Sequence, residues 1–297
     1  MRQWKVRANE CESFLPPPVA ESRQALPPCW ASGRLVFVKS VSFKGRVREV
    51  RSCSGARFAA VSHAPNSIID SHQHDWPNLT IHLAGACVER FDDTSALLNG
   101  PGVVFHPAFS GHADEVLSSG LETVGLMFDP AWLSNFALGN AFDRPRSWLG
   151  GRAALAARKL VAIWTSRTVD EAHLRRATAH FFHVATANEH RRPAWLDQAS
   201  DMLAGESPAS TRSIAESLNL HPAWLARRYR QATGEGLHET LRRKRVERAL
   251  TALRASDAPL AEVALDSGFC DQPHMNRCFR QVLGQSPQAY RSAAQAR

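Results

Sequence analysis

Two stretches near the C-terminus carry side chains suited to hydrogen bonding with nucleic acid. Arginine, asparagine and glutamine present donor groups that match DNA base edges and phosphate oxygens. The outward positions of the first stretch hold Ala223, Ala226, Arg227 and Arg230, and those of the second hold Gln272, His274, Asn276, Arg277 and Arg280. We therefore expect these positions to form a surface that contacts double-stranded DNA.

The two stretches are copies of one repeat with a period of about fifty residues. The first copy reads SIAESLNLHPAWLARRYRQATGEG from Ser213, and the second reads EVALDSGFCDQPHMNRCFRQVLGQSP from Glu262. In each copy a small alanine is followed four residues later by Asn219 or Gly268, residue types that tolerate a left-handed turn. Each copy is thus predicted to be a short helix, a tight turn and a longer helix, which is the layout of a helix-turn-helix. The alternative is a plain helical hairpin with a solvated face, which two copies in register disfavour.

The segment between the copies, HETLRRKRVERALTALRAS, has an apolar stripe that no proline or glycine interrupts. About eighteen helical residues at 1.5 Å each span roughly 27 Å. With the turns at its ends, such a helix would separate two recognition helices by about one DNA turn, roughly 34 Å. We expect Arg245 to be structural because it lies beside Val246 near the stripe. The other cations from Arg242 to Lys244 are expected either to approach phosphate or to form a solvated face.

Residues 195–292 resemble the DNA-binding domain of the AraC family of bacterial transcription regulators. The family pattern IAxxxGFxDxxxFxRxFxxxxGxSPxxYR is present here as VALDSGFCDQPHMNRCFRQVLGQSPQAYR. Val263 replaces the usual Ile and Met275 the usual Phe, and both changes conserve volume. The first copy has His221 and Pro222 where the family often has Ser, so we expect its second helix to lack the usual hydroxyl cap. The resemblance implies sequence-specific DNA binding that regulates transcription.

Composition and charge agree with this interpretation. The length of 297 residues suits two domains. The net charge of +8 and the pI of about 9.6 are compatible with a polyanionic partner. From Arg191 to the end there are 16 Lys and Arg against 11 Asp and Glu, or 16 − 11 = +5, so the basic charge is concentrated where the repeat lies.

Several other classes of protein are disfavoured. The six cysteines include no CxxC pair, which argues against a zinc finger or a disulfide framework. No apolar run approaches eighteen residues, and the N-terminus has no stretch like a signal peptide. We therefore expect a cytoplasmic protein without a membrane partner and without a cofactor.

The N-terminal part of the chain changes character twice. Residues 1–33 are rich in Pro, Ser and Arg, and we expect them to form a poorly ordered leader. Residues 34–130 contain β-rich runs, namely LVFVKSVSF, ARFAAVSHA, LTIHLAGACVERF, GVVFHPA and LETVGLMF, that Gly, Pro, Asn and Asp interrupt. These runs predict an antiparallel sandwich or small barrel that ends at Asp129-Pro130.

Two segments of this β-rich region, SHQHDWPNLTIHLAG and NGPGVVFHPAFSGHAD, resemble the motifs of the cupin barrel, the usual sensor domain of AraC-family regulators. Metal-binding cupins use His-x-His, then a Glu and a later His. Here His72 and His74 match the first pair and His112 the last, whereas the Glu position holds Asn78 or Leu79. His72 and His74, two residues apart on a strand, face the same side. His82 and His106 are further candidates outside the motif.

Three interpretations of these histidines remain. His72, His74 and His112 are assigned first to a pocket for a small organic effector. Alternatively they are structural residues at a barrel mouth, or they bind a metal such as Zn, Fe or Cu. Because the Glu is missing from the motif, we assign no metal site.

Residues 131–193 are predicted to be helical, because GGRAALAARKLVAIWTS and VDEAHLRRATAHFFHVATANEH place apolar residues three and four apart. This helical pair and linker is expected either to mediate a homodimer, as the resemblance implies, or to cover the barrel. The predicted chain is thus an α+β multidomain protein: an antiparallel cupin-like barrel with a helical pair, followed by an all-α double helix-turn-helix at 194–297.

We interpret the sequence as a transcription regulator that an effector controls, with promoter DNA and RNA polymerase as partners and no catalytic activity. One alternative is a metal-dependent cupin enzyme, such as a dioxygenase, fused to a DNA-binding unit. Another is an architectural DNA-binding protein without a sensor pocket. The sequence leaves the effector, the operator and the direction of regulation open.

Overall fold

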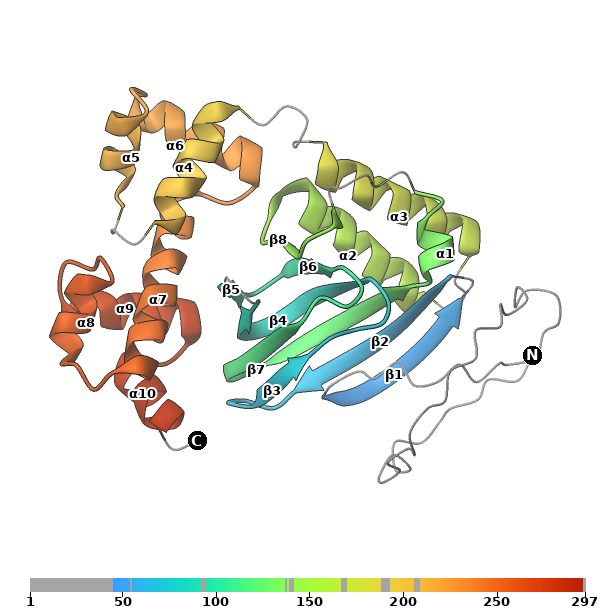
Figure 1. Ribbon diagram of the computed structural model, residues 1–297, viewed down its shortest axis with the longest axis horizontal. Helices are drawn as coiled ribbons and strands as arrows, with labels where there is room; N and C mark the ends of the chain where they lie inside the picture. Colours follow the sequence, from blue (N-terminus) through green and yellow to red (C-terminus); the bar gives the residue numbers. More distant parts are fainter. Residues whose placement is uncertain are drawn as a thin grey trace.

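A computed structural model describes residues 45–53, 55–91, 95–136, 138, 142–166, 170–187, 193–205 and 209–295. The predicted leader at 1–33 and the predicted strand at 35–43 lie outside these residues. The described chain has an N-terminal antiparallel sheet with helices and a C-terminal all-helical part, so the predicted α+β fold class is confirmed (Figure 1).

One antiparallel sheet organises the N-terminal part. Its strands are β1 (Arg46–Cys53), β2 (Ala56–His63), β3 (Ile68–His72), β4 (Asn78–Arg90), β5 (Ser95–Asn99), β6 (Gly102–His106), β7 (His112–Phe128) and β8 (Arg146–Trp148). The strand order is β1-β2-β7-β4-β6-β8, with β3 paired to β7 and β5 paired to β4. The long strands β4 and β7 therefore connect every part of this sheet, which we call the sensor sheet after the role that the sequence predicts for it.

β4 and β7 bend where their pairing register shifts. The shifts lie between His82 and Ala84 and between Gly85 and Cys87, and such bulges bend a strand. Gly85 has φ 89°, and a Cβ added to it would lie 2.0 Å from the carbonyl oxygen of Gly120. Only glycine allows the two backbones to approach this closely at this φ.

The sheet extends beyond the predicted end at Asp129-Pro130, because β8 pairs with β6. A strand of three residues is too short to show a period-2 pattern, which is why the sequence did not predict it. The sequence also did not predict β1, RVREVRSC, because this edge strand has no buried residue.

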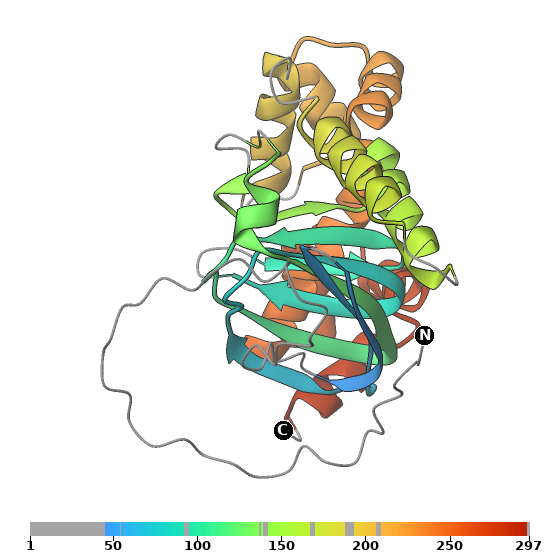
Figure 2. The same cartoon turned by 90° about the vertical axis from the view of Figure 1, so that its right-hand side faces the viewer.

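Helices α2 (Gly151–Thr165) and α3 (Glu171–Thr186) cover one face of the sheet (Figures 1 and 2). Aromatic packing fills the layer between them: Phe58 of β2 stacks on Trp164 of α2 with ring centroids 3.8 Å apart. Phe105 and Phe182 meet edge to face at 6.2 Å. Covering the sheet is therefore one role of the helical pair, while its role in a dimer stays a prediction. We call the sheet with α2 and α3 the sensor region.

The C-terminal part begins after a short helix, α1 (Pro130–Leu133), and the sensor helices. It contains α4 (Ala194–Ala204), α5 (Thr211–Ser217), α6 (Pro222–Thr233), α7 (Leu237–Ala255), α8 (Leu260–Asp266), α9 (Gln272–Leu283) and α10 (Pro287–Gln295). We call α5 and α6 with their turn the first unit, and α8 and α9 with theirs the second unit. α7 joins the units, and its 19 residues span about 28 Å. None of the described helices is long and apolar enough to cross a membrane.

Candidate nucleic-acid interface and sensor pocket

The turns of the two units have the same backbone geometry. Asn219 has φ 51° and Gly268 has φ 88°, so both stand in the left-handed region that the sequence predicted. The next residues, Leu220 and Phe269, donate their N–H groups to the carbonyl five residues earlier, at 2.8 and 2.9 Å. Both side chains pack into the angle between the helices. The helix-turn-helix predicted from the repeat is therefore present twice.

The second helix of each unit has a side-chain cap at its start. Asp271 accepts a hydrogen bond from the N–H of His274 at 2.6 Å, as predicted for α9. α6 lacks the usual hydroxyl cap, as expected, and Nδ1 of His221 accepts from the N–H of Ala223 at 3.3 Å in its place. A neutral imidazole can thus replace the hydroxyl of Ser. Both helices end at a left-handed glycine, Gly234 or Gly284.

α6 and α9 turn their apolar residues inward and their predicted contact residues outward. The buried residues are Leu225 and Tyr229 in α6, and Met275, Cys278, Phe279 and Leu283 in α9. The exposed predicted residues are Ala223, Arg227, Arg230, Arg277 and Arg280, and the half-exposed ones are Ala226, Gln272, His274 and Asn276. The structure thus brings each predicted set onto the outer side of one helix.

The arginines of this region divide into outward and structural ones. Within the described residues no acidic side chain pairs with Arg227, whereas Arg230 lies 3.6 Å from Glu239 with both side chains more than half exposed. Arg243 is 15% exposed and pairs with Glu235 and Glu247, each at 3.0 Å. Arg243 therefore stabilises α7, and the expectation that it approaches phosphate is wrong.

Arg245 has the structural role that the sequence predicted. Its guanidinium donates to the carbonyl of Ala209 at 3.1 Å and so fixes the segment that precedes α5. Lys244 lies 2.7 Å from Glu247 and is partly exposed. Arg242 is thus the member of the basic run that has neither an ion pair nor a side-chain hydrogen bond among the described residues.

The sequence did not point to a pair of tryptophans beside α6. Trp224 is 40% exposed on α6, and its ring meets Trp195 of α4 edge to face at 5.5 Å. The guanidinium of Arg228 lies 5.6 Å from the ring of Trp224. A tryptophan at an outward helical position, flanked by alanine, was the signal that could have identified this surface.

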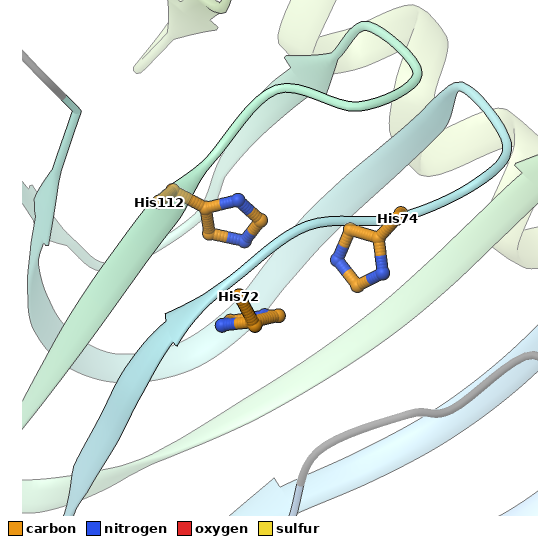
Figure 3. A group of neighbouring side chains, drawn as sticks. All are labelled: His72, His74 and His112. Carbon is orange, nitrogen blue, oxygen red and sulfur yellow. The ribbon is translucent and has the colours of Figure 1, made fainter. Parts of the chain in front are cut away.

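Three histidines converge in the sensor sheet, as Figure 3 shows. His72 ends β3, His74 follows two residues later and His112 begins β7. The ring centroids lie 5.1 Å apart for His72 and His74, 4.2 Å for His72 and His112, and 5.2 Å for His74 and His112. Nitrogen atoms of the three rings lie within 4.8 Å of one another. The structure therefore brings together the residues that the sequence assigned to one site.

Backbone carbonyl groups set the tautomers of two of these rings. Nδ1 of His72 lies 2.9 Å from the carbonyl oxygen of Asp70, and Nδ1 of His112 lies 3.4 Å from that of Ser110. A carbonyl oxygen only accepts, so each Nδ1 carries the proton and each Nε2 carries the lone pair. Burial, with His72 and His74 nearby, lowers the pKa of His112 to about 3. His112 is therefore a neutral imidazole near neutral pH.

The cavity around the histidines has a volume of about 70 Å³. Besides the three histidines, its lining includes His82 and His106, the further candidates outside the motif. It also includes a polar set that the sequence did not assign: His63, Thr80, Glu89, Asp114 and Thr123. A small cavity with this many polar groups suits a small polar ligand or a hydrated ion better than a large apolar molecule.

Glu89 places a carboxyl group beside the histidines, although the sequence motif has none at its Glu position. Its Oε1 lies 3.2 Å from Nε2 of His106, and both side chains are buried. The ring of His106 in turn stacks on that of His112, with centroids 4.2 Å apart. Burial, together with Asp114, raises the pKa of Glu89, and burial lowers the pKa of His106, so burial favours the uncharged form of each group.

The position of Glu89 changes the argument about a metal. At the expected Glu position, Asn78 is buried in β4 opposite His106, and Glu89 lies eleven residues further along the same strand. His72, His74 and His112 form one group that could hold a metal ion, and Glu89, His106 and His112 form a second. A missing carboxyl group is therefore no longer a reason to exclude a metal.

Comparison with known proteins identifies the C-terminal part. Residues 214–293 match the family model described as "Helix-turn-helix domain". The regulatory protein SoxS of Escherichia coli K12 is 28% identical over 98 residues, which cover 33% of this chain and 87% of SoxS. A putative AraC-like transcription regulator of Streptomyces antibioticus is 29% identical over 129 residues, 39% of this chain and 43% of that protein.

A comparison with solved structures extends over more of the chain. A structure of ToxT from Vibrio cholerae aligns with 80% of this chain and 98% of the ToxT chain, at 10% identity and a TM-score of 0.37. A score this low adds nothing to the assignment, which depends on the helix-turn-helix region.

Proposed function

Because this chain is a DNA-binding transcription regulator of the AraC family, we propose that a small ligand bound among the histidines of its sensor sheet controls its binding to DNA. The observation that supports this proposal is the convergence of three imidazoles on one polar cavity whose lining includes the start of β7, a strand that also contacts the C-terminal helices. We propose that the protein is a cytoplasmic homodimer that acts together with RNA polymerase, and we assign it no catalytic step.

In the proposed complex α6 and α9 enter the major groove of the DNA. Arg227 and Arg277 read base edges from the exposed sides of these helices, and Gln272 and Asn276 add further donors in α9. Arg230 and Arg280, one turn further along each helix, contact phosphate groups. Alanines at 223 and 226 leave only apolar contacts beside Arg227.

The DNA-binding proposal is tested by gel shift of the full chain on DNA that the protein itself selects from a random pool. Binding should weaken steeply between 50 and 200 mM salt, because phosphate contacts release counterions. Affinity that is independent of salt, or equal for all sequences, would contradict sequence-specific binding by the two units.

A transition-metal ion is a second candidate for the ligand of the sensor cavity. Nε2 of His72 and His112 are held as lone-pair donors by the carbonyl contacts to Nδ1, an arrangement typical of histidines that bind metals. Imidazole nitrogen suits Zn, Cu, Fe or Ni. The three histidines thus fit a metal, and a bound ion would act here as the signal and would link the end of β3, the segment that follows it and the start of β7.

His74→Ala distinguishes these alternatives. We expect it to blunt the response to the ligand and to leave DNA affinity without ligand nearly unchanged, while His180→Ala, an exposed histidine of α3, serves as the control. Stoichiometric zinc, copper, iron or nickel in the purified wild-type protein, lost in His74→Ala, would favour the metal. Loss of the folded sheet in His74→Ala would show that the histidines are structural and would contradict the proposed site.

A further inference from the structure

The two units differ in the residues that complete their hydrophobic cores. Buried residues of the first unit cluster with α4 and the start of α7, and within the described residues this cluster includes none from the sheet. Buried residues of the second unit form a cluster that extends into the sensor sheet through Ala86, Val88, Leu97 and Leu117. The second unit therefore packs against the sensor region as if the two were one domain.

Glu115 lies at the centre of this contact. Its side chain is fully buried on β7. The hydroxyl of Tyr290 in α10 donates to its carboxylate, at 3.1 and 3.3 Å from the two oxygens. Arg90 of β4 donates to Oε2 at 2.7 Å, and Arg254 of α7 donates to the same oxygen. A buried carboxylate is costly unless it is paired, and two of these three partners of the side chain come from the C-terminal helices.

Two further hydrogen bonds flank Glu115. The N–H of Leu97 in β5 donates to the carboxylate of Glu247 in α7 at 2.8 Å. The hydroxyl of Ser118 in β7 donates to the carbonyl oxygen of Leu283 at 3.3 Å. Leu283 is the last residue of α9, so the sensor sheet contacts the end of the recognition helix itself. The contact thus involves α7, α9 and α10.

The strand that carries Glu115 also lines the histidine cavity. Successive residues of a strand point to opposite faces, and on β7 His112 and Asp114 line the cavity while Glu115 and Leu117 face the C-terminal helices. β4 does the same, with Glu89 on the cavity side and Arg90 on the other. A ligand that shifts the end of β7 therefore acts on a segment only three residues from Glu115.

We propose that the second unit is the half of the DNA-binding part that responds to the sensor, and that Glu115, bound by Arg254 and Tyr290, is the contact that positions it. This inference rests on the proposed control of DNA binding by the sensor cavity. A cavity of about 100 Å³ remains beside the contact, lined by residues that include Val88, Leu250 and Arg254. The interface therefore has room to rearrange without disturbing a tightly packed core.

The contacts of Glu115 with Arg254 and Tyr290 leave the DNA-contacting side of α9 exposed. Arg277 and Arg280 are exposed on α9, whereas Arg254 and Tyr290 face the sheet. The second unit thus contacts DNA while Glu115 holds it, and loss of the contact lets α9 leave its position relative to α6. We expect that loss to weaken the DNA contacts of the second unit and to spare those of the first.

The test measures the two halves of the DNA site separately in the full chain. Arg227→Ala and Arg277→Ala first assign the bases that each recognition helix reads, because each change relaxes preference over its own half. Competition binding then compares the selected site with versions in which one half is scrambled. Glu115→Gln and Arg254→Gln are the test variants.

Glu122→Gln is the matched control for Glu115→Gln. Glu122 lies on the same strand, and its carboxylate pairs with Arg48 at the surface at 2.8 Å, away from the C-terminal helices. The side chain of Arg254 is 35% exposed, so Arg254→Gln keeps the test informative if Glu115→Gln fails to fold. Thermal melting followed by circular dichroism identifies a variant that does not fold.

The contribution of a half-site is the factor by which its intact sequence raises the affinity over the scrambled version. We expect Glu115→Gln and Arg254→Gln to reduce this factor for the second half-site at least about fivefold. The contribution of the first half-site should stay within about twofold, and Glu122→Gln should change neither. Equal losses from both halves, or no loss in a folded variant, would overturn the inference. Failure of the cavity to bind any ligand would instead contradict the proposed function without changing these half-site measurements, so the two failures are distinguishable.

Discussion

The two helix-turn-helix units have the same local geometry and different surroundings. Each turn has a left-handed residue, Asn219 or Gly268, and each recognition helix ends at a left-handed glycine. The first unit completes its core with its neighbouring helices, whereas the second completes it with the sensor sheet. The repeated motif therefore determines the shape of a unit, and the surface against which it packs determines how independent the unit is.

The outward side chains of α6 and α9 also differ between the two units. The first unit presents alanine at 223 and 226, while the second presents Gln272 and Asn276 at outward positions of α9. Amide side chains hydrogen-bond to base edges, and alanine contributes only apolar contact. We therefore expect most of the base discrimination to come from the unit that the sensor region positions.

The strongest test of this difference removes one fully buried side chain from each unit. Phe279→Ala in α9 should destabilise by about 3–5 kcal/mol and Leu225→Ala in α6 by about 2–5 kcal/mol, since each leaves a cavity. Hydrogen exchange of the full chain should show faster exchange in β5 and α10 for Phe279→Ala, because they share its cluster. Leu225→Ala should affect only α4, α5, α6 and the start of α7, which share its cluster. Faster exchange of the sheet in Leu225→Ala would contradict separate cores.

The first unit also touches the sensor region, where Gly234 at the end of α6 lies against Gly151 at the start of α2. A pair of glycine substitutions measures this contact. A Cβ added to Gly234 would lie 2.2 Å from Cα of Gly151, whereas a Cβ added to Gly284 would meet nothing within 4 Å. Both residues have positive φ, so Gly284→Ala should cost about 1–2 kcal/mol from the backbone alone. Gly234→Ala should cost more, because α6 and the start of α2 must separate.

Urea unfolding compares the two glycine variants. The difference between their midpoints reports the clash with Gly151, since the backbone cost is common to both. Equal midpoints would mean that Gly234 does not touch the sensor region in solution and that the first unit is wholly free of it.

Arg227→Ala should weaken DNA binding by about 1–3 kcal/mol at the preferred base and relax the preference there. Arg230→Ala is the comparison, since a phosphate contact weakens all sequences alike and its loss reduces the salt slope by about one unit. Binding to a panel of site variants distinguishes the two roles. A uniform loss for Arg227→Ala with a lowered melting temperature would show that Arg227 stabilises the fold.

The smallest expected difference between the units is in the stability lost when the N-cap of α9 or α6 is removed. Asp271→Ala should destabilise the second unit by about 0.5–2 kcal/mol, because the N–H of His274 loses its acceptor. His221→Ala should cost less, since the hydrogen bond from Ala223 to the imidazole is longer, at 3.3 Å. Thermal unfolding of both variants measures which one loses more stability. A larger loss for His221→Ala than for Asp271→Ala would contradict this prediction.

The sequence predicted the features that are local along the chain. Left-handed turns at Asn219 and Gly268, the cap at Asp271 and the pairing of His72 with His74 all depend on residues within a few positions of one another. The α+β class could be predicted for the same reason, because the strand and helix patterns each occupy a continuous segment.

The features that the sequence did not reveal depend on distant residues. Glu115 lies between the predicted β-rich runs GVVFHPA and LETVGLMF, and its partners in the C-terminal helices lie 139 and 175 residues away. Glu89 reaches the cavity because bulges in β4 change which side chains face inward. Neither pairing has a short-range pattern, so only the fold brings these groups together.

Hydrogen exchange in the folded Arg254→Gln variant tests most directly whether the sensor region supports the second unit and not the first. We predict that the amide groups of α8 and α9 exchange faster than in the wild type, that those of α5 and α6 exchange at unchanged rates, and that Glu122→Gln alters neither. Equal acceleration in both units, or none in α8 and α9, would contradict the account.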